Sequence, residues 1–193
     1  MKNLKTFEDL FESEDLSDSL VSIEEFARRI GIDPSMIPGI SEWWNENRSN
    51  IDIHLFNFSS TEPICGVILG IDTICINNRD LRMPPHVKMF LALHESRHCD
   101  QYREGGFMEG YYDTVINNDL SAFLEAYSIF ERDANDYAIG SMREIGFNRE
   151  MDREEGRLRS NEIAGNMVFR MMQNDINRLN PTDFFDLLKK QIL

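Results

Sequence analysis

Residues 84–106 read P-P-H-V-K-M-F-L-A-L-H-E-S-R-H-C-D-Q-Y-R-E-G-G, and this stretch predicts one long helix. The two prolines indicate its start, because proline is tolerated in the first helical turn. The two glycines indicate its end, so we expect the helix to run from about Pro85 to about Glu104. Its apolar residues at roughly helical spacing are Val87, Phe90, Leu91 and Leu93.

The middle of this helix carries the pattern H-E-x-x-H at residues 94–98. On a helix, His94 and His98 project from one face, and two imidazoles at that separation can bind one Zn²⁺. Glu95 lies beside them, where it could take a proton from a water bound to the metal. The simpler alternative is a helix whose histidines pack or cap without metal, but the apolar residues before the motif favour a buried site.

A catalytic zinc site needs three protein ligands and one open position. The metzincin pattern would place Gly at position 101 and His at position 104, where this chain has Gln101 and Glu104. The third ligand must therefore come from elsewhere, and a second helix expected over residues 121–142 can supply it. The apolar stripe of that helix consists of Phe123, Tyr127, Phe130, Ala134, Tyr137 and Ala138.

Glu131 lies next to this stripe and is the expected third ligand. Asn135 lies one turn further on the same face and could hold a neighbouring ligand in place. The small Ala134 and Ala138 would let the two helices approach closely. Four other acidic residues remain alternatives to Glu131, namely Glu125, Asp133, Asp136 and Glu104.

Residues 94–98, together with residues 131–138 (E-R-D-A-N-D-Y-A), resemble the gluzincin arrangement. In particular they resemble the ImmA/IrrE-like metallopeptidases, whose second motif has the form E-x-x-A-N-x-F-A. The resemblance covers about residues 64–142. In that family the two histidines and the first glutamate of the second motif bind zinc, and the glutamate of the first motif is the general base. The resemblance therefore implies His94, His98 and Glu131 as ligands, with Glu95 as the base.

The chain departs from the family pattern at a few positions. The family usually has Leu-Gly where this chain has Ser96 and Arg97, and Tyr137 replaces Phe. Gln101 and Tyr102, which follow the motif, also resemble SprT-like minimal peptidases. These departures leave the set of proposed ligands unchanged.

The resemblance implies an α+β protein: a mainly helical, zincin-like metallopeptidase fold with a small β-sheet or hairpin before the active-site helix. It implies a zinc-dependent endopeptidase with one Zn²⁺ per chain and a protein or peptide substrate. One alternative is a zinc-binding module without activity that acts through a partner, and another is a helical protein with an accidental motif. The donor for the oxyanion stays open among Tyr111, Tyr112, Tyr127, His54 and His86.

Strands are expected before the motif helix. Residues 51–55 alternate between apolar and polar, and residues 66–69 and 73–76 flank Gly70-Ile71-Asp72 as in a hairpin. In the resembling peptidases, an edge strand of this kind can hold a substrate chain by β-addition.

We expect residues 1–193 to form one domain, because this length can bury a sizeable core. Residues 1–20 are an acidic N-terminal segment. Residues 22–47 are expected to be helical, with Ser22 as N-cap and Glu25 completing a capping box. We expect this segment to pack on the core; the alternative, a first helix of a helix-turn-helix, lacks a clear second helix.

The C-terminal part, residues 147–193, is expected to contribute helices packed on the core. A charged break is expected at residues 148–159, followed by a helix over residues 161–179. A last helix is expected over residues 182–188, capped by Thr182.

The formal net charge of −14 repels phosphate backbones and anionic lipids, which disfavours binding to nucleic acids and membranes. No apolar run approaches the roughly 20 residues that span a bilayer, and the first residues lack the apolar region of a secretory signal. Three cysteines without C-x-x-C spacing indicate a reducing compartment, and Cys99 is expected to be a buried thiol. We therefore expect a cytoplasmic protein; no feature predicts its oligomeric state.

Overall fold

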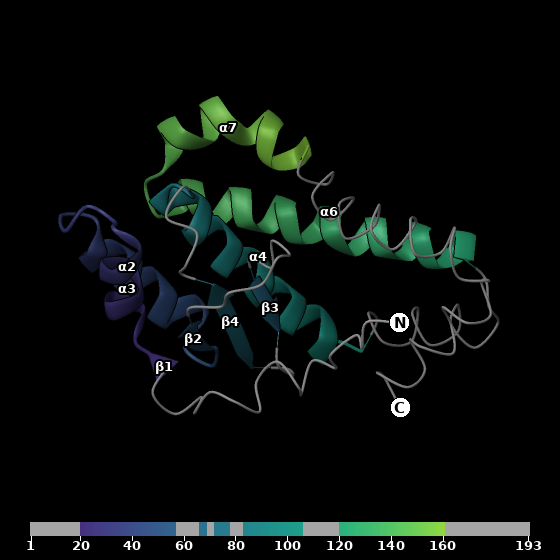
Figure 1. The fold of residues 1–193 in the computed structure, drawn as a ribbon, viewed down its shortest axis with the longest axis horizontal. Coiled ribbons are helices and arrows are strands. Elements are labelled where there is room, and N and C mark those ends of the chain that lie inside the picture. Colours follow the sequence, from purple (N-terminus) through teal and green to yellow (C-terminus); the bar gives the residue numbers. More distant parts are fainter. Residues whose placement is uncertain (1–19, 57–65, 69–71, 78–82, 106–119, 161–193) are drawn as a thin grey trace, which may run out of the picture.

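The computed structural model describes residues 20–56, 66–68, 72–77, 83–105 and 120–160. Within these ranges the chain is mainly helical with a small sheet, as the sequence predicted for an α+β protein. The elements lie in layers, with the sheet on one side of the motif helix and a second long helix on the other (Figure 1).

The sheet has four strands in the order β1-β2-β4-β3. Strand β2 is antiparallel to β1 and parallel to β4, and β3 pairs with β4 as an antiparallel strand. The predicted hairpin is thus confirmed, although residues 69–71 lie outside the described residues. The bounds of the strands are β1 (Leu20–Val21), β2 (Asp52–Phe56), β3 (Gly66–Ile68) and β4 (Thr73–Asn77).

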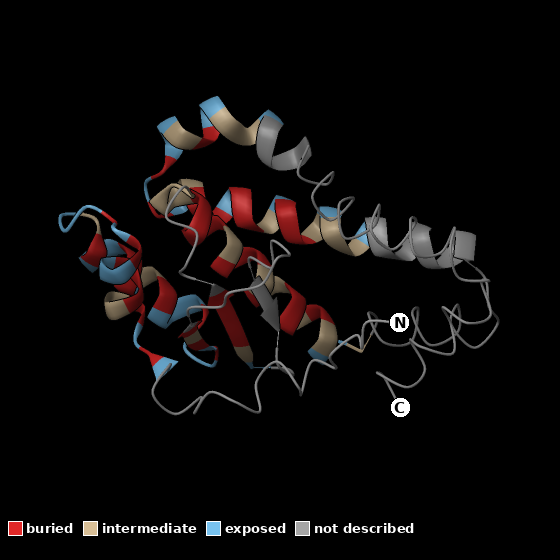
Figure 2. Ribbon diagram, in the orientation of Figure 1, coloured by how far each residue is buried: buried red, intermediate tan, exposed pale blue. Residues whose placement is uncertain are grey.

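Burial along the strands follows from their place in the sheet. Ile53 and Leu55 of β2 are buried while Asp52 is exposed, which confirms the predicted alternation. In β4, the consecutive residues Ile74, Cys75 and Ile76 are all fully buried. Because successive side chains of a strand point to opposite faces, both faces of β4 are shielded from solvent. Strand β4 is therefore at the centre of the core (Figure 2).

Five helices are present among the described residues: α2 (Ile23–Ile30), α3 (Ile37–Asn47), α4 (Pro85–Arg103), α6 (Leu120–Glu144) and α7 (Asn148–Ser160). Helix α4 is the predicted motif helix, and it ends before Gly105, whose φ of 79° is left-handed. Helix α6 confirms the second predicted helix. Helix α4 packs against β3 and β4 on one side and against α6 on the other.

The segment 22–47 contains two helices rather than one. Helix α2 ends where Gly31 adopts a φ of 89°, a left-handed conformation that favours glycine. Ser22 caps α2 as predicted, since its Oγ accepts a hydrogen bond from the backbone N–H of Glu25 at 3.2 Å. The capping box is not completed in this way, because the Glu25 carboxylate pairs with Arg28 and Arg29 instead. Helix α2 packs on α3, α4 and the sheet, which confirms the expected role in the core.

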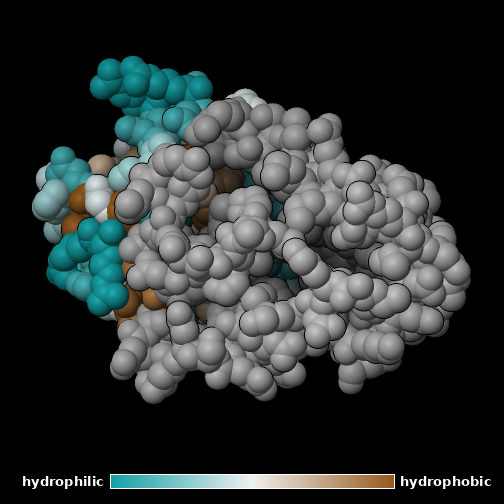
Figure 3. Space-filling model, in the orientation of Figure 1, coloured by the Kyte–Doolittle hydropathy of each residue, from teal (hydrophilic) through white to brown (hydrophobic). Residues whose placement is uncertain are grey.

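The charged break expected at residues 148–159 is wrong, because these residues form helix α7. Its charged residues Arg149, Asp152 and Arg153 are exposed, and the outer surface of α7 is hydrophilic in Figure 3. Met151 is fully buried and fixes the helix to the core. Across the turn from α6, Arg143 pairs with Glu155 at 2.7 Å. The predictions for residues 1–19, 161–179 and 182–188 lie outside the described residues.

Two cysteines in the described ranges, Cys75 and Cys99, are free and buried, which confirms the prediction for Cys99. Burial raises the pKa of both thiols to about 12, with a further contribution from the Glu95 carboxylate. None of the described helices is both long and apolar enough to pass through a bilayer.

Candidate metal centre

The structure brings the three predicted ligands together. His94 and His98 come from α4, and Glu131 comes from α6. The Nε2 atoms of the two histidines lie 3.0 Å apart. The Glu131 carboxylate spans both rings, with Oε2 at 3.3 Å from the Nε2 of His94 and Oε1 at 3.3 Å from the Nε2 of His98. The two imidazole planes are nearly perpendicular, at 87°. One ligand atom of each of the three residues lies within 4.8 Å of the other two.

These separations fit the donor set of a zinc ion. Donors bound at about 2.0–2.1 Å in a tetrahedron lie about 3.3–3.4 Å from one another. The three distances among the donor atoms of His94, His98 and Glu131, at 3.0, 3.3 and 3.3 Å, are close to that value. Two imidazoles and one carboxylate also form a known set for catalytic zinc, in which a fourth position stays open.

Local sequence explains why these side chains meet. The four-residue spacing places His94 and His98 on one face of α4. On α6, the fully buried Ala134 and Ala138 present small side chains, which allow a close approach of the two helices. Both histidines are buried, at 8% and 7% exposure, so the site is shielded from bulk water.

In the metal-free cluster, the two histidines and Glu131 shift each other's pKa values. Burial raises the pKa of Glu131, but hydrogen bonds from His94 and His98 outweigh it and lower the pKa well below its usual range. Burial lowers the pKa of His98, yet Glu131, Glu95 and Gln101 together raise it to about 9. In the metal-free protein the Glu131 carboxylate is therefore ionised and His98 is protonated at neutral pH.

Glu95 is half-buried beside the two histidines. Burial raises its pKa, Glu131 adds to that rise, and the charges of His94 and His98 oppose it. A carboxylate whose pKa is raised accepts a proton more readily than an ordinary glutamate does. Its place next to the predicted ligands is the one expected for a general base.

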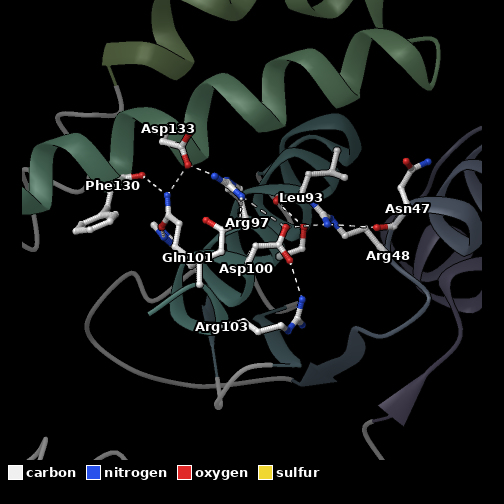
Figure 4. A network of polar contacts seen from close by, with 12 residues as sticks. Asn47, Arg48, Leu93, Arg97, Asp100, Gln101, Arg103, Phe130 and Asp133 are labelled. Atoms are coloured by element: carbon white, nitrogen blue, oxygen red, sulfur yellow. Dashed lines mark hydrogen bonds and ion pairs between the residues drawn. The ribbon is translucent and has the colours of Figure 1, made fainter. Parts of the chain in front are cut away.

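Sequence reasoning missed Gln101 as a partner of the site. Its Oε1 lies 2.7 Å from the Nδ1 of His98. Its Nε2 donates to the backbone carbonyl of Phe130 and to Asp133 (Figure 4). The spacing could have revealed this, because Gln101 lies three residues after His98 on the same helix. Arg97 donates from Nε to the same Asp133 oxygen at 2.7 Å. The charged Arg97, a departure from the family pattern, thus has a partner on α6.

Asn135, predicted to hold a ligand, is buried at 4% exposure on α6. Gln101 lies at the Nδ1 of His98, and the role of Asn135 stays a prediction. The alternatives to Glu131 differ in their contacts. Asp133 binds Arg97 and Gln101, while Glu104 is exposed and pairs with Arg97. Asp136 is exposed, and the side chain of Glu125 lies outside the described residues.

A second group of charges holds α4 to its neighbours. The buried Arg48, just after α3, pairs with Asp100 of α4 at 2.8 Å. Its guanidinium also lies over the Tyr137 ring of α6, 4.3 Å from the ring centroid. Arg103 is a further partner of Asp100, at 3.0 Å. These contacts fix the helix that carries both histidines (Figure 4).

The donor for an oxyanion stays open. His86 lies two turns before His94 and faces Glu154 of α7, with its Nε2 3.0 Å from the carboxylate. His54 lies in β2, opposite Leu20 of β1 and Cys75 of β4. The other candidates, Tyr111, Tyr112 and the side chain of Tyr127, lie outside the described residues.

Comparisons with known protein families, with curated proteins and with solved structures found no match. The resemblance to gluzincins therefore rests on two short motifs, residues 94–98 and 131–138, and on the geometry that joins them.

Proposed function

We propose that the protein is a zinc-dependent metallopeptidase, an endopeptidase with a zincin-like fold. The observation that carries this proposal is the convergence of His94, His98 and Glu131 from two helices, with donor separations suited to Zn²⁺. Glu95 supports the catalytic form of the proposal, because a site that only binds zinc needs the ligands and not a base.

In this proposal, His94, His98 and Glu131 hold one Zn²⁺ per chain. Zinc supplies Lewis acidity, which polarises a carbonyl and makes a water molecule more acidic. Glu95 accepts the proton of the attacking water and then passes it to the leaving amine.

The sheet offers a place for a peptide substrate. Among the described strands, β3 is at an edge of the sheet, and it packs against α4, the helix that carries the histidines. An extended peptide can add to such an edge through backbone hydrogen bonds. A peptide substrate is also compatible with the net charge of −14, which disfavours nucleic acids.

The test compares the zinc-loaded protein with Glu95→Gln, which keeps the size of the side chain and both histidines. Both proteins are incubated with cell lysates, and new peptide termini are identified by mass spectrometry. We expect cleavages that depend on Glu95, with activity lower in the variant by a factor of about 10² or more. Identical termini in both samples, with zinc content confirmed, would contradict the peptidase and favour a binding module that acts through a partner.

A further inference from the structure

We propose that Gln101 is a positioning residue that keeps the Nδ1 of His98 protonated and its Nε2 directed toward the metal position. This inference rests on the proposed metal site, which it deepens. It is carried by a chain of hydrogen bonds that runs from α6 to the His98 ring through the buried Gln101, whose exposure is 3%.

The orientation of the Gln101 amide is determined by its surroundings. Its Nε2 lies 3.0 Å from the carbonyl oxygen of Phe130 and 2.7 Å from Oδ2 of Asp133. A backbone carbonyl and a carboxylate only accept hydrogen bonds, so the NH₂ group of the amide must face them. The amide oxygen then faces His98 and accepts from its Nδ1, at 2.7 Å.

That arrangement determines which ring nitrogen of His98 can bind a metal. The oxygen of Gln101 only accepts, so Nδ1 carries a proton and Nε2 is the nitrogen available to a cation. Rotating the ring by 180° would place carbon atoms where both nitrogens now lie, and the bond to Gln101 would be lost. Gln101 therefore sets both the tautomer and the orientation of the ring, as partners of metal-binding histidines commonly do.

Asp133 is in turn held by Arg97, which donates from Nε to the same oxygen that accepts from Gln101. The chain of hydrogen bonds thus begins at Arg97 on α4, passes through Asp133 on α6, and returns to α4 at Gln101. His94 lacks such support, because its buried Nδ1 has no hydrogen-bond partner in the described part of the chain. His98 is accordingly the ligand whose geometry the protein controls more strictly.

The test observes the ring N–H groups of the histidines by NMR in isotopically labelled, metal-free protein, and zinc affinity by competition with a chelator. In the natural protein, the Nδ1 proton of His98 exchanges slowly with water. In Gln101→Met, which has a similar size but no hydrogen bond, this signal is lost and zinc affinity falls by about 10–100-fold. The control Glu104→Gln also removes a contact of Arg97 on α4, and it should change neither measurement.

Asp133→Ala provides a second variant in case Gln101→Met does not fold. Asp133 is half-exposed, and it is one of the two acceptors that orient the Gln101 amide. In this variant we expect faster exchange of the His98 Nδ1 proton and a several-fold loss of zinc affinity. An unchanged Nδ1 proton signal, or zinc affinity within about twofold of the natural protein, overturns the positioning role. If the natural protein binds no zinc, the proposed function fails, and the NMR comparison alone still decides whether Gln101 fixes the ring.

Discussion

Replacing Glu131 with alanine removes the carboxylate by which α6 contacts the Nε2 atoms of His94 and His98. The carboxylate lies 3.3 Å from each of them, which places it as one of three protein donors. Zinc in a complete four-donor protein site binds with about 10–16 kcal/mol, so one donor contributes about 2.5–4 kcal/mol. Since each 1.4 kcal/mol is tenfold, Glu131→Ala should weaken zinc binding by about 10²–10³-fold.

The assay is a titration of each variant with zinc in competition with a chelator, with circular dichroism as a check of folding. Asp136→Ala is the matched control, because Asp136 is exposed on the same helix, five residues later. Glu125→Ala tests the alternative ligand and should cost far less affinity than Glu131→Ala. Zinc affinity that is unchanged in Glu131→Ala, or a larger loss in Glu125→Ala, would refute the assignment of the third ligand.

Three further predictions concern stability and packing. In metal-free protein, His98 has a pKa raised from 6.5 to about 9, so its stabilisation is complete below 6.5 and is lost as pH rises through 9. The lowered pKa of Glu131 adds stability above pH 4.5, and this stability is lost on acidification. Denaturant titrations should therefore find the joint contribution of His98 and Glu131 to the free energy of unfolding greatest between pH 4.5 and 6.5. This contribution should be absent in Glu131→Gln. Met151→Ala should cost about 2–5 kcal/mol in urea unfolding, because the buried Met151 anchors α7; a loss near zero would contradict that anchor. Ala138→Leu should overfill the buried face of α6, costing about 1–3 kcal/mol and weakening zinc binding, and unchanged affinity and stability would show that α6 has room there.

The parts of the fold that local sequence determines could be predicted. The bounds of α4 follow from prolines and glycines at its ends, and H-E-x-x-H places two ligands on one face. Glu131 was predicted from its position beside an apolar stripe, and the structure places it between the two histidines. Each of these inferences needs only the helical period.

The parts that depend on distant contacts could not be predicted. Arg97 and Gln101 meet Asp133 only because α4 and α6 pack together, and no spacing along the chain encodes that contact. The parallel pairing of β2 with β4 is likewise non-local, and β1 is too short, at two residues, to give a pattern. Helix α7 was missed because its charges resemble a solvated loop, whereas the buried Met151 fixes it to the core.

The measurement that tests the account most directly is the zinc content of the purified protein, determined by elemental analysis. We predict about one zinc per chain for the natural protein and a severe loss when His94→Ala and His98→Ala are combined. Both histidines supply donor atoms to the proposed site, so their removal leaves Glu131 alone. Full zinc content in the double variant, or none in the natural protein purified without chelators, would contradict the metal centre.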